Sequence, residues 1–206
     1  MISALVTDFY ELTMMQGYFL QHHNPRVVFD MFYRTNPFNG GYTIFTGLEE
    51  LVTILENFRF SEEDINYLRS LGKFQESFLE YLASYRFTGD LYAFDEGTPA
   101  FPQEPLIRVE TNMLDAQLIE SVLLNTINFQ TLIATKASRM KLATKSHGSI
   151  MEFGLRRAQG MDGALSASRA CYIGGADVTS NTLAGKEFGI PVAGTMAHSW
   201  IMLFSD

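Results

Sequence analysis

The sequence has little cysteine, little positive charge and no long apolar run. Cys171 is its only cysteine, which excludes an intramolecular disulfide and a cysteine-based zinc site and favours a reducing, cytoplasmic setting. Lys and Arg number 15 against 23 Asp and Glu, so the net charge is −8 and neither nucleic acid nor an anionic membrane surface is an expected partner. Polar residues interrupt every window of about 18 residues, so we expect no transmembrane helix. His22 and His23 have no cysteine or carboxylate at metal-ligand spacing, and we assign no residue as a metal ligand.

The rest of the composition is typical of a folded protein that mixes helices and strands. Hydrophobic residues make up 47% of the chain and charged residues 18%, which is enough apolar surface to bury a core. β-branched and aromatic residues predict a strand over residues 26–33. Shorter strands are expected at residues 91–94 and 106–109.

Helices are expected where apolar residues recur on one face. Residues 48–58 show this spacing after Thr46, which we interpret as the start of a capping box with Glu49. Ser61 is followed directly by acidic residues, which suit the positive end of a helix dipole, and it predicts another helix start. A longer pattern over residues 114–140 has a wide apolar face and predicts a well-buried helix.

The pattern of the sequence changes around this long helix. We therefore divide the chain into an N-terminal α/β domain, residues 1–112, and the start of an α/β barrel, residues 113–206. The second part alternates short apolar segments with helical ones, which is typical of βα units. Its expected strands are 149–153, 174–178 and 190–196, and its expected helices are 163–173 and 182–188.

A closed βα barrel needs about eight strands, and this chain offers far fewer. We expect it to be the front portion of a longer protein, with the barrel incomplete. In such a barrel the reactive groups lie where strands end and loops begin. The three strand ends carry Arg156 and Arg157, then residues 179–181, then Thr195 and His198.

Each of these groups has a structural interpretation beside a functional one. His198 could act as a base or phosphoryl acceptor, or could simply hydrogen-bond at a barrel rim. Arginine forks bind carboxylates and phosphates, yet Arg156 and Arg157 could equally be solvated loop cations. The hydroxyl of Ser180 suits an anion, whereas residues of this type more often cap a helix. Phe153 could stack on a flat ring or pack in the core.

Several motifs resemble the nicotinate phosphoribosyltransferase family. They are TDFYELTM at 7–14, FNGGY at 38–42, FTGLE at 45–49, NTINFQTLIATK at 125–136, EFGLRRAQG at 152–160, TSN at 179–181 and GTMAHSW at 194–200. They run in family order along the whole chain, and EFGLRRAQG together with GTMAHSW is a highly specific pair. The resemblance implies an N-terminal α/β domain followed by the first part of an irregular α/β barrel, as in type II phosphoribosyltransferases. It also implies a homodimer whose active sites use both subunits.

The resemblance further implies roles for individual residues. His198 matches the catalytic histidine that ATP phosphorylates. Tyr10, reaching in from the partner subunit, and Phe153 match the aromatic residues that stack on the two faces of the nicotinate ring. Thr195 and Arg156 match positions that line the same pocket.

Two more residues are implicated in the same way. Asp8 resembles an acid that orients groups near the site. Ser180 stands where relatives that use nicotinamide carry an acidic residue, which would repel the carboxylate of nicotinate. Ser180 therefore favours nicotinate as the substrate.

The implied reaction joins nicotinate to phosphoribosyl pyrophosphate, giving nicotinate mononucleotide and pyrophosphate in the salvage route to NAD. ATP is the implied co-substrate, hydrolysed through a phosphohistidine, and Mg²⁺ is expected to accompany the polyphosphates. Residues 1–206 by themselves are expected to be inactive, because the later barrel strands have no counterpart here. Two alternatives stay open, namely a relative that acts on nicotinamide or quinolinate and a non-catalytic, truncated fragment.

Overall fold

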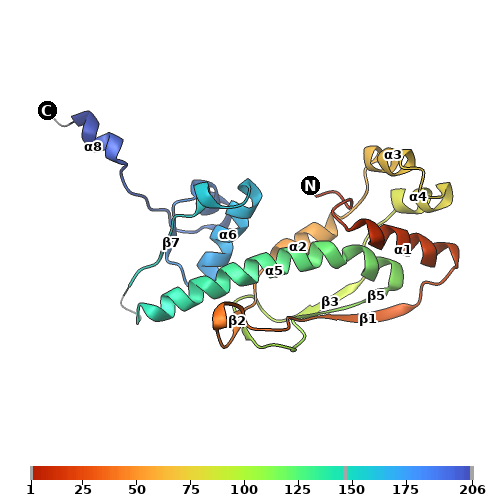
Figure 1. Ribbon diagram of the computed structural model, residues 1–206, viewed down its shortest axis with the longest axis horizontal. Coiled ribbons are helices and arrows are strands. Elements are labelled where there is room, and N and C mark those ends of the chain that lie inside the picture. Colours follow the sequence, from red (N-terminus) through yellow and green to blue (C-terminus); the bar gives the residue numbers. More distant parts are fainter. Residues whose placement is uncertain (1, 146–147, 205–206) are drawn as a thin grey trace. The chain divides into compact units, whose positions relative to one another are not determined.

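The computed structural model describes residues 2–145 and 148–204 (Figure 1). The chain divides into two compact units, Met1–Phe129 and Gln130–Asp206. The division falls inside the long helix α5 (Met113–Ala143), whereas the boundary drawn from the sequence, after residue 112, falls at the start of that helix.

The first unit is built on a three-stranded antiparallel sheet with the order β1-β5-β3. The expected strands are confirmed with slightly different ends, as β1 (Arg26–Met31), β3 (Asp90–Ala93) and β5 (Ile107–Asn112). Side chains alternate between the two faces, as strand geometry requires. Met31, Ile107 and Val109 are buried, while Arg108 is exposed and donates to Asp30 from Nε to Oδ1 over 2.9 Å.

Helices and short elements complete this unit. They are α1 (Phe9–Leu20), η1 (Pro37–Asn39), β2 (Thr43–Ile44), α2 (Leu48–Glu56), α3 (Glu62–Ser70), α4 (Glu76–Ala83) and β4 (Pro99–Ala100). The prediction of a helix start at Ser61 is confirmed, because its hydroxyl accepts from the Asp64 amide and its own amide donates to the Asp64 carboxylate. Asp8 is the N-cap of α1, and its amide donates to Glu11.

The capping box expected at Thr46 and Glu49 is wrong. Gly47 is the N-cap of α2, with a φ of 104° that suits glycine, and the Thr46 hydroxyl donates to the Ile44 carbonyl. The first amides of α2, those of Gly47 and Leu48, instead donate to the carboxylate of Glu96. A distant acid therefore caps this helix, which local spacing in the sequence does not reveal.

Helix α5 supplies much of the apolar core of the first unit. Leu118, Ile119, Val122 and Ile127 are buried, as the periodicity of residues 114–140 predicts. No helix in the described ranges combines the length and the apolarity that crossing a lipid bilayer requires.

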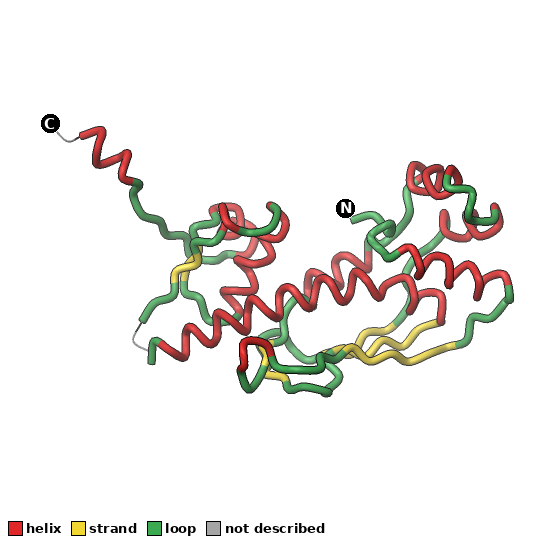
Figure 2. The backbone as a smooth tube through the Cα atoms, in the orientation of Figure 1, coloured by secondary structure: helices red, strands yellow, loops and turns green. Residues whose placement is uncertain are grey.

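The second unit contains a short parallel ladder. Its remaining elements are β6 (Met151–Glu152), η2 (Leu155–Arg157), α6 (Met161–Ile173), β7 (Val178–Thr179), α7 (Thr182–Phe188) and α8 (His198–Phe204). Strands β6 and β7 pair in parallel, and Thr179 forms a parallel bridge with Val192. The helices expected at 163–173 and 182–188 are confirmed. The strands expected at 149–153 and 174–178 are shorter than predicted, and the segment 190–196 contributes only the bridge at Val192 (Figure 2).

Helix α6 ends against α5 at Gly174. A β-carbon on this residue would lie 2.3 Å from the backbone oxygen of Ala134, so only glycine allows the approach. Beside this contact, the Asp177 carboxylate accepts from the Lys141 Nζ over 2.8 Å and from the Ile150 amide over 2.7 Å. The contacts hold α6 and the start of β7 on the part of α5 that belongs to the second unit.

The buried carboxylate of Asp115 lies in the first turn of α5, directly after β5 ends. Asp115 is 2% exposed and accepts hydrogen bonds from the Thr88 and Thr111 hydroxyls, both over 3.2 Å. Its own amide donates to the side chain of Asn112. Burial raises the pKa of Asp115, and the hydrogen bonds that it accepts oppose this rise.

The raised pKa of Asp115 predicts a pH dependence of stability. An acid whose pKa is higher in the folded state binds its proton more tightly there, so its contribution to stability falls as pH rises above the unfolded value of about 3.9. We expect the difference in free energy of unfolding between wild type and Asp115→Asn to decrease as pH increases through this window. Urea titrations at a series of pH values measure it, and a difference that is constant or grows with pH would contradict the prediction.

Phe78 tests the aromatic cluster of the first unit. This side chain is fully buried in α4, and its ring centroid lies 5.5 Å from that of Phe19 and 5.9 Å from that of Phe74. We expect Phe78→Ala to lower the free energy of unfolding by about 3–5 kcal/mol. Phe101→Ala, at a residue that is 50% exposed, is the matched control and should change it by less than about 0.5 kcal/mol.

Candidate functional site

The three strand ends of the second unit meet around one cavity. Its volume is about 350 Å³. The residues that line it include Phe153, Arg156, Arg157, Ser180, Gly194 and Thr195. The structure therefore brings together five of the residues singled out in the sequence, namely Phe153, Arg156, Arg157, Ser180 and Thr195, from three segments separated along the chain.

The first wall of the cavity follows β6. Phe153 comes directly after the strand and is half-buried, and Arg156 lies in the single helical turn η2. Arg157 steadies this turn, since its amide donates to the Gly154 carbonyl over 2.8 Å and its Nη1 donates to the Phe153 carbonyl over 3.3 Å. Arg156 and Arg157 are both exposed, so their charges face solvent and any anion that enters.

The second wall follows β7. The Ser180 amide donates to the Glu152 carbonyl over 2.9 Å, which continues the parallel ladder to the edge of the cavity. Asn181 is the N-cap of α7 and accepts from the Ala184 amide over 3.3 Å. The capping interpretation therefore holds for Asn181, while Ser180 lines the cavity.

The third segment follows the bridge at Val192. Gly194 and Thr195 line the cavity and are exposed. His198 is exposed at the first position of α8 and is not among the lining residues. The imidazole is thus open to solvent, three residues beyond the cavity wall.

Asp8 and Tyr10 lie in the first unit, beside a different cavity of about 530 Å³. It is lined by the segment before α1, by the first turn of α1 and by part of α5 that includes Glu120 and Ser121. Glu11, at its base, is 1% exposed and accepts from the hydroxyls of Thr7 and Ser121. Burial raises the pKa of Glu11, partly offset by these hydrogen bonds.

Tyr10 is 49% exposed at the rim of this cavity. Its hydroxyl reaches the Glu11 carboxylate at 3.5 Å. Partial desolvation raises the pKa of the Tyr10 phenol, and the nearby carboxylates of Glu120, Glu11 and Asp8 raise it further. The ring of Tyr10 therefore stays neutral and partly free to contact another molecule.

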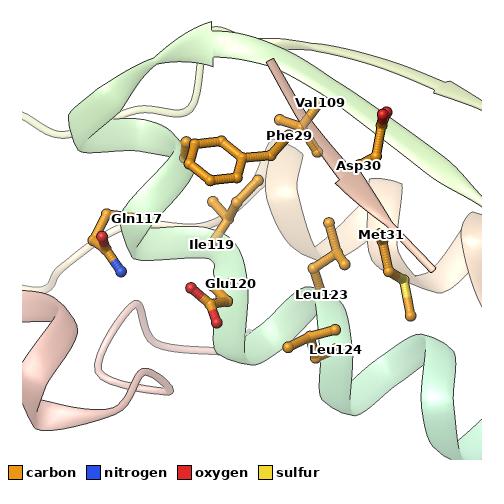
Figure 3. Close-up of a pocket in the computed structure, with 10 residues that line it drawn as sticks. Phe29, Asp30, Met31, Val109, Gln117, Ile119, Glu120, Leu123 and Leu124 are labelled. Atoms are coloured by element: carbon orange, nitrogen blue, oxygen red, sulfur yellow. The ribbon is translucent and has the colours of Figure 1, made fainter. Parts of the chain in front are cut away.

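A third cavity, of about 240 Å³, lies between β1, β5 and α5 (Figure 3). Its lining is mostly apolar and includes Phe29, Ile119 and Leu123, with the Glu120 side chain at its side (Figure 3). None of the residues selected from the sequence lines it. It lacks the cation and the hydroxyls that distinguish the cavity at the strand ends.

A buried polar network behind the strand-end cavity was not anticipated. The Glu152 carboxylate accepts from the hydroxyls of Thr179 and Ser168, and both hydroxyls also accept from Asn181. The sequence signal was available, because Glu152 opens the EFGLRRAQG motif and Thr179 opens the TSN motif. Hydrophobic periodicity does not register such polar partners.

The described residues contain no group of three or more His, Cys, Asp or Glu side chains that could hold a metal ion. The strand-end cavity instead combines an aromatic ring, guanidinium groups and hydroxyls. This combination suits a flat ring that carries a carboxylate or phosphate, because guanidinium binds the anion while the ring stacks.

Comparisons with known proteins agree with this chemistry. The family model for the nicotinate phosphoribosyltransferase (NAPRTase) N-terminal domain matches residues 5–128. Nicotinate phosphoribosyltransferase pncB2 of Mycobacterium tuberculosis is 44% identical over 205 residues, which cover 100% of this chain and 44% of that protein.

Two solved structures match nearly the whole chain. The crystal structure of human nicotinic acid phosphoribosyltransferase matches with a TM-score of 0.89 and 39% identity, covering 97% of this chain and 41% of the human chain. Nicotinate-nucleotide pyrophosphorylase from Pyrococcus furiosus matches with a TM-score of 0.80 and 26% identity, covering 98% of this chain and 44% of the other. The expected fold, an N-terminal α/β domain followed by the first part of an α/β barrel, is confirmed.

The chain spans less than half the length of the relatives that it matches. The match of the family model, the identity along the full chain and the shared fold all point to one group of proteins. The chain belongs to the nicotinate phosphoribosyltransferase family and carries the N-terminal domain of that family in residues 5–128.

Proposed function

We propose that this chain supplies the nicotinate-binding part of an enzyme that makes nicotinate mononucleotide from nicotinate and phosphoribosyl pyrophosphate. The observation that carries the proposal is the cavity at the three strand ends, where Phe153, Arg156, Ser180 and Thr195 meet. The relatives are named for this activity.

The cavity provides a group for each part of nicotinate. The guanidinium of Arg156 pairs with the carboxylate, and the ring of Phe153 stacks on one face of the pyridine. The hydroxyls of Ser180 and Thr195 donate to the carboxylate oxygens beside Arg156, which leaves the lone pair of the ring nitrogen free. A neutral hydroxyl at position 180 accepts the anionic substrate, whereas a carboxylate there would repel it.

In this proposal a second subunit completes the site. Its Tyr10 stacks on the other face of the pyridine, and its Asp8 orients groups nearby. The half-exposed ring of Tyr10, set among carboxylates that keep its phenol protonated, supports this role. The enzyme is accordingly a homodimer with shared sites.

The glycosyl transfer forms one bond and breaks another. The nicotinate ring nitrogen attacks the anomeric carbon, the bond from that carbon to the pyrophosphate oxygen breaks, and pyrophosphate leaves with the electron pair. Positive charge develops on the sugar in the transition state, and fixed dipoles and the departing anion stabilise it. Holding the pyridine between two rings aligns its nitrogen for the attack.

We propose that His198 couples ATP hydrolysis to this reaction. A ring nitrogen attacks the γ-phosphorus, the bond to the β-γ bridging oxygen breaks, and ADP leaves. Water later cleaves the phosphohistidine and releases phosphate. The exposed position of His198, just past the cavity wall at Thr195, supports access for ATP.

Mg²⁺ enters this proposal only with the substrates. It binds the oxygens of ATP and of pyrophosphate groups and neutralises their charge. The proposed cytoplasmic setting rests on Cys171 being the single cysteine of the sequence, which is typical of proteins from a reducing compartment.

Replacing the imidazole tests the ATP coupling. We expect His198→Ala, in the protein as its gene encodes it, to form nicotinate mononucleotide at a rate that ATP no longer raises. Product formation with and without ATP, and incorporation of labelled γ-phosphate, are the measurements. His23→Ala, at another exposed histidine, should retain both the stimulation and the label. Full ATP stimulation in His198→Ala would overturn the role.

The second test concerns the choice of base. We expect Ser180→Asp to lower kcat/KM for nicotinate relative to nicotinamide by about tenfold or more, which corresponds to a repulsion of about 1.4 kcal/mol or more. Ser180→Asn adds similar bulk without charge and is the matched control. Competition among nicotinate, nicotinamide and quinolinate measures the preference. Equal loss in both variants would show that bulk, and not charge, decides it.

A further inference from the structure

Three donors from separate segments converge on the carboxylate of Glu152. The Thr179 hydroxyl donates to Oε2 over 2.6 Å, and the Ser168 hydroxyl donates to the same oxygen over 2.9 Å. The amide of Gly154 donates to Oε1. The side chain of Glu152 is therefore hydrogen-bonded to Gly154 at the N-cap of η2, to Ser168 in α6 and to Thr179 in β7.

The neighbours of Thr179 fix the direction of its hydrogen bond. The Thr179 hydroxyl oxygen accepts from the Asn181 amide over 3.0 Å, so its proton is directed to Glu152. The Ser168 oxygen accepts from Nδ2 of Asn181 over 3.2 Å, and its proton is shared between Glu152 and the Ala164 carbonyl, which lies 3.0 Å away. A carboxylate, which only accepts, is the group that fits these donors, and hydrogen bonds to it are stronger than those to a neutral acceptor.

The partners of Glu152 are shielded from water, while Glu152 itself is partly exposed. Thr179 and Ser168 are each 1% exposed, and Asn181 is 3% exposed. Loss of the Glu152 carboxylate would leave the buried Thr179 hydroxyl without its acceptor, which is costly for a buried donor. A β-carbon at Gly154 would lie 2.8 Å from Oε1 of Glu152, so glycine here lets the carboxylate close onto the backbone.

We infer that Glu152 is a positioning residue that fixes the separation between the two walls of the nicotinate cavity. The first wall begins at Phe153 and Gly154, and the second begins at Ser180, between Thr179 and Asn181. Glu152 is hydrogen-bonded to Gly154 in the first wall and to Thr179 next to the second wall, and its own side chain does not line the cavity. The inference rests on the proposed nicotinate site.

Loss of Glu152 should therefore act on substrate geometry. We expect Glu152→Ala, in the protein as its gene encodes it, to raise KM for nicotinate by about tenfold while KM for ATP stays unchanged. Thr179→Val keeps the shape and removes one donor, and it should shift KM for nicotinate in the same direction by a smaller factor. Thr179→Ser keeps the hydroxyl and should restore most of the affinity.

Asp177 offers a matched control in the same unit. Its carboxylate also holds two segments together, through Lys141 and the Ile150 amide, and Asp177 is not among the residues that line the cavity. Asp177→Asn should lower the melting temperature as Glu152→Ala does and leave KM for nicotinate unchanged. An equal rise of KM in both variants would overturn the inference, because it would reflect general destabilisation.

Hydrogen exchange separates this inference from the proposed function. In Glu152→Ala the amides of Gly154 and Ser180 should exchange faster than in wild type, whereas Asp177→Asn should not accelerate them. Unchanged exchange at both amides, with an unchanged KM, would overturn the positioning role. Absence of any nicotinate mononucleotide from the wild-type protein would overturn the proposed function, and faster exchange would then still support the coupling of the two walls.

Discussion

Parallel pairing of three short segments is the constraint on which the strand-end cavity depends. The Ser180 amide donates to the Glu152 carbonyl, and Thr179 exchanges backbone hydrogen bonds with the Pro191 carbonyl and the Ala193 amide, each about 3 Å long. Parallel strands end at the same edge of a sheet, so the loops that follow them must meet. A few backbone bonds thus gather residues from three segments, represented by Phe153, Ser180 and Thr195, around a single cavity.

A net charge of −8 is compatible with a site for an anion because recognition is local. Arg156 and Arg157 place two positive charges on one turn of the cavity wall. Glu152, the acidic residue that opens the same sequence motif, accepts hydrogen bonds on both of its carboxylate oxygens. Its charge is therefore held away from the ligand. The net charge disfavours partners that require a large basic face, such as nucleic acid, and leaves small anionic substrates open.

Helix ends that depend on neighbouring residues can be predicted from the sequence. The helix at Thr182–Phe188 was expected with the bounds observed, because Asn181 caps its start and Gly189, at a φ of 68°, ends it. The start of α2 at Leu48 agrees with the expectation, whereas the capping box expected there is wrong, because the acid that caps the helix, Glu96, is 48 residues away in the chain. The convergence of Phe153, Ser180 and Thr195 could be expected from the strand ends alone. The role of Tyr10 comes only from family resemblance, and for His198 the resemblance favours one of the two interpretations that the sequence leaves open.

Along each short strand and the residues after it, side chains that support the cavity wall alternate with side chains that line the cavity. Glu152 points into the polar network and Phe153 lines the cavity; Thr179 is buried in the network and Ser180 lines the cavity, before Asn181 turns inward again. Side chains with a period of two must face opposite ways, so each cavity residue has supporting neighbours next to it in sequence. In this chain Glu152, Thr179 and Asn181 therefore support the cavity wall without lining the cavity. The alternation also means that the identity of Ser180 can change the choice of ligand without disturbing the hydrogen bonds that hold the wall, since its own side chain lies outside the network.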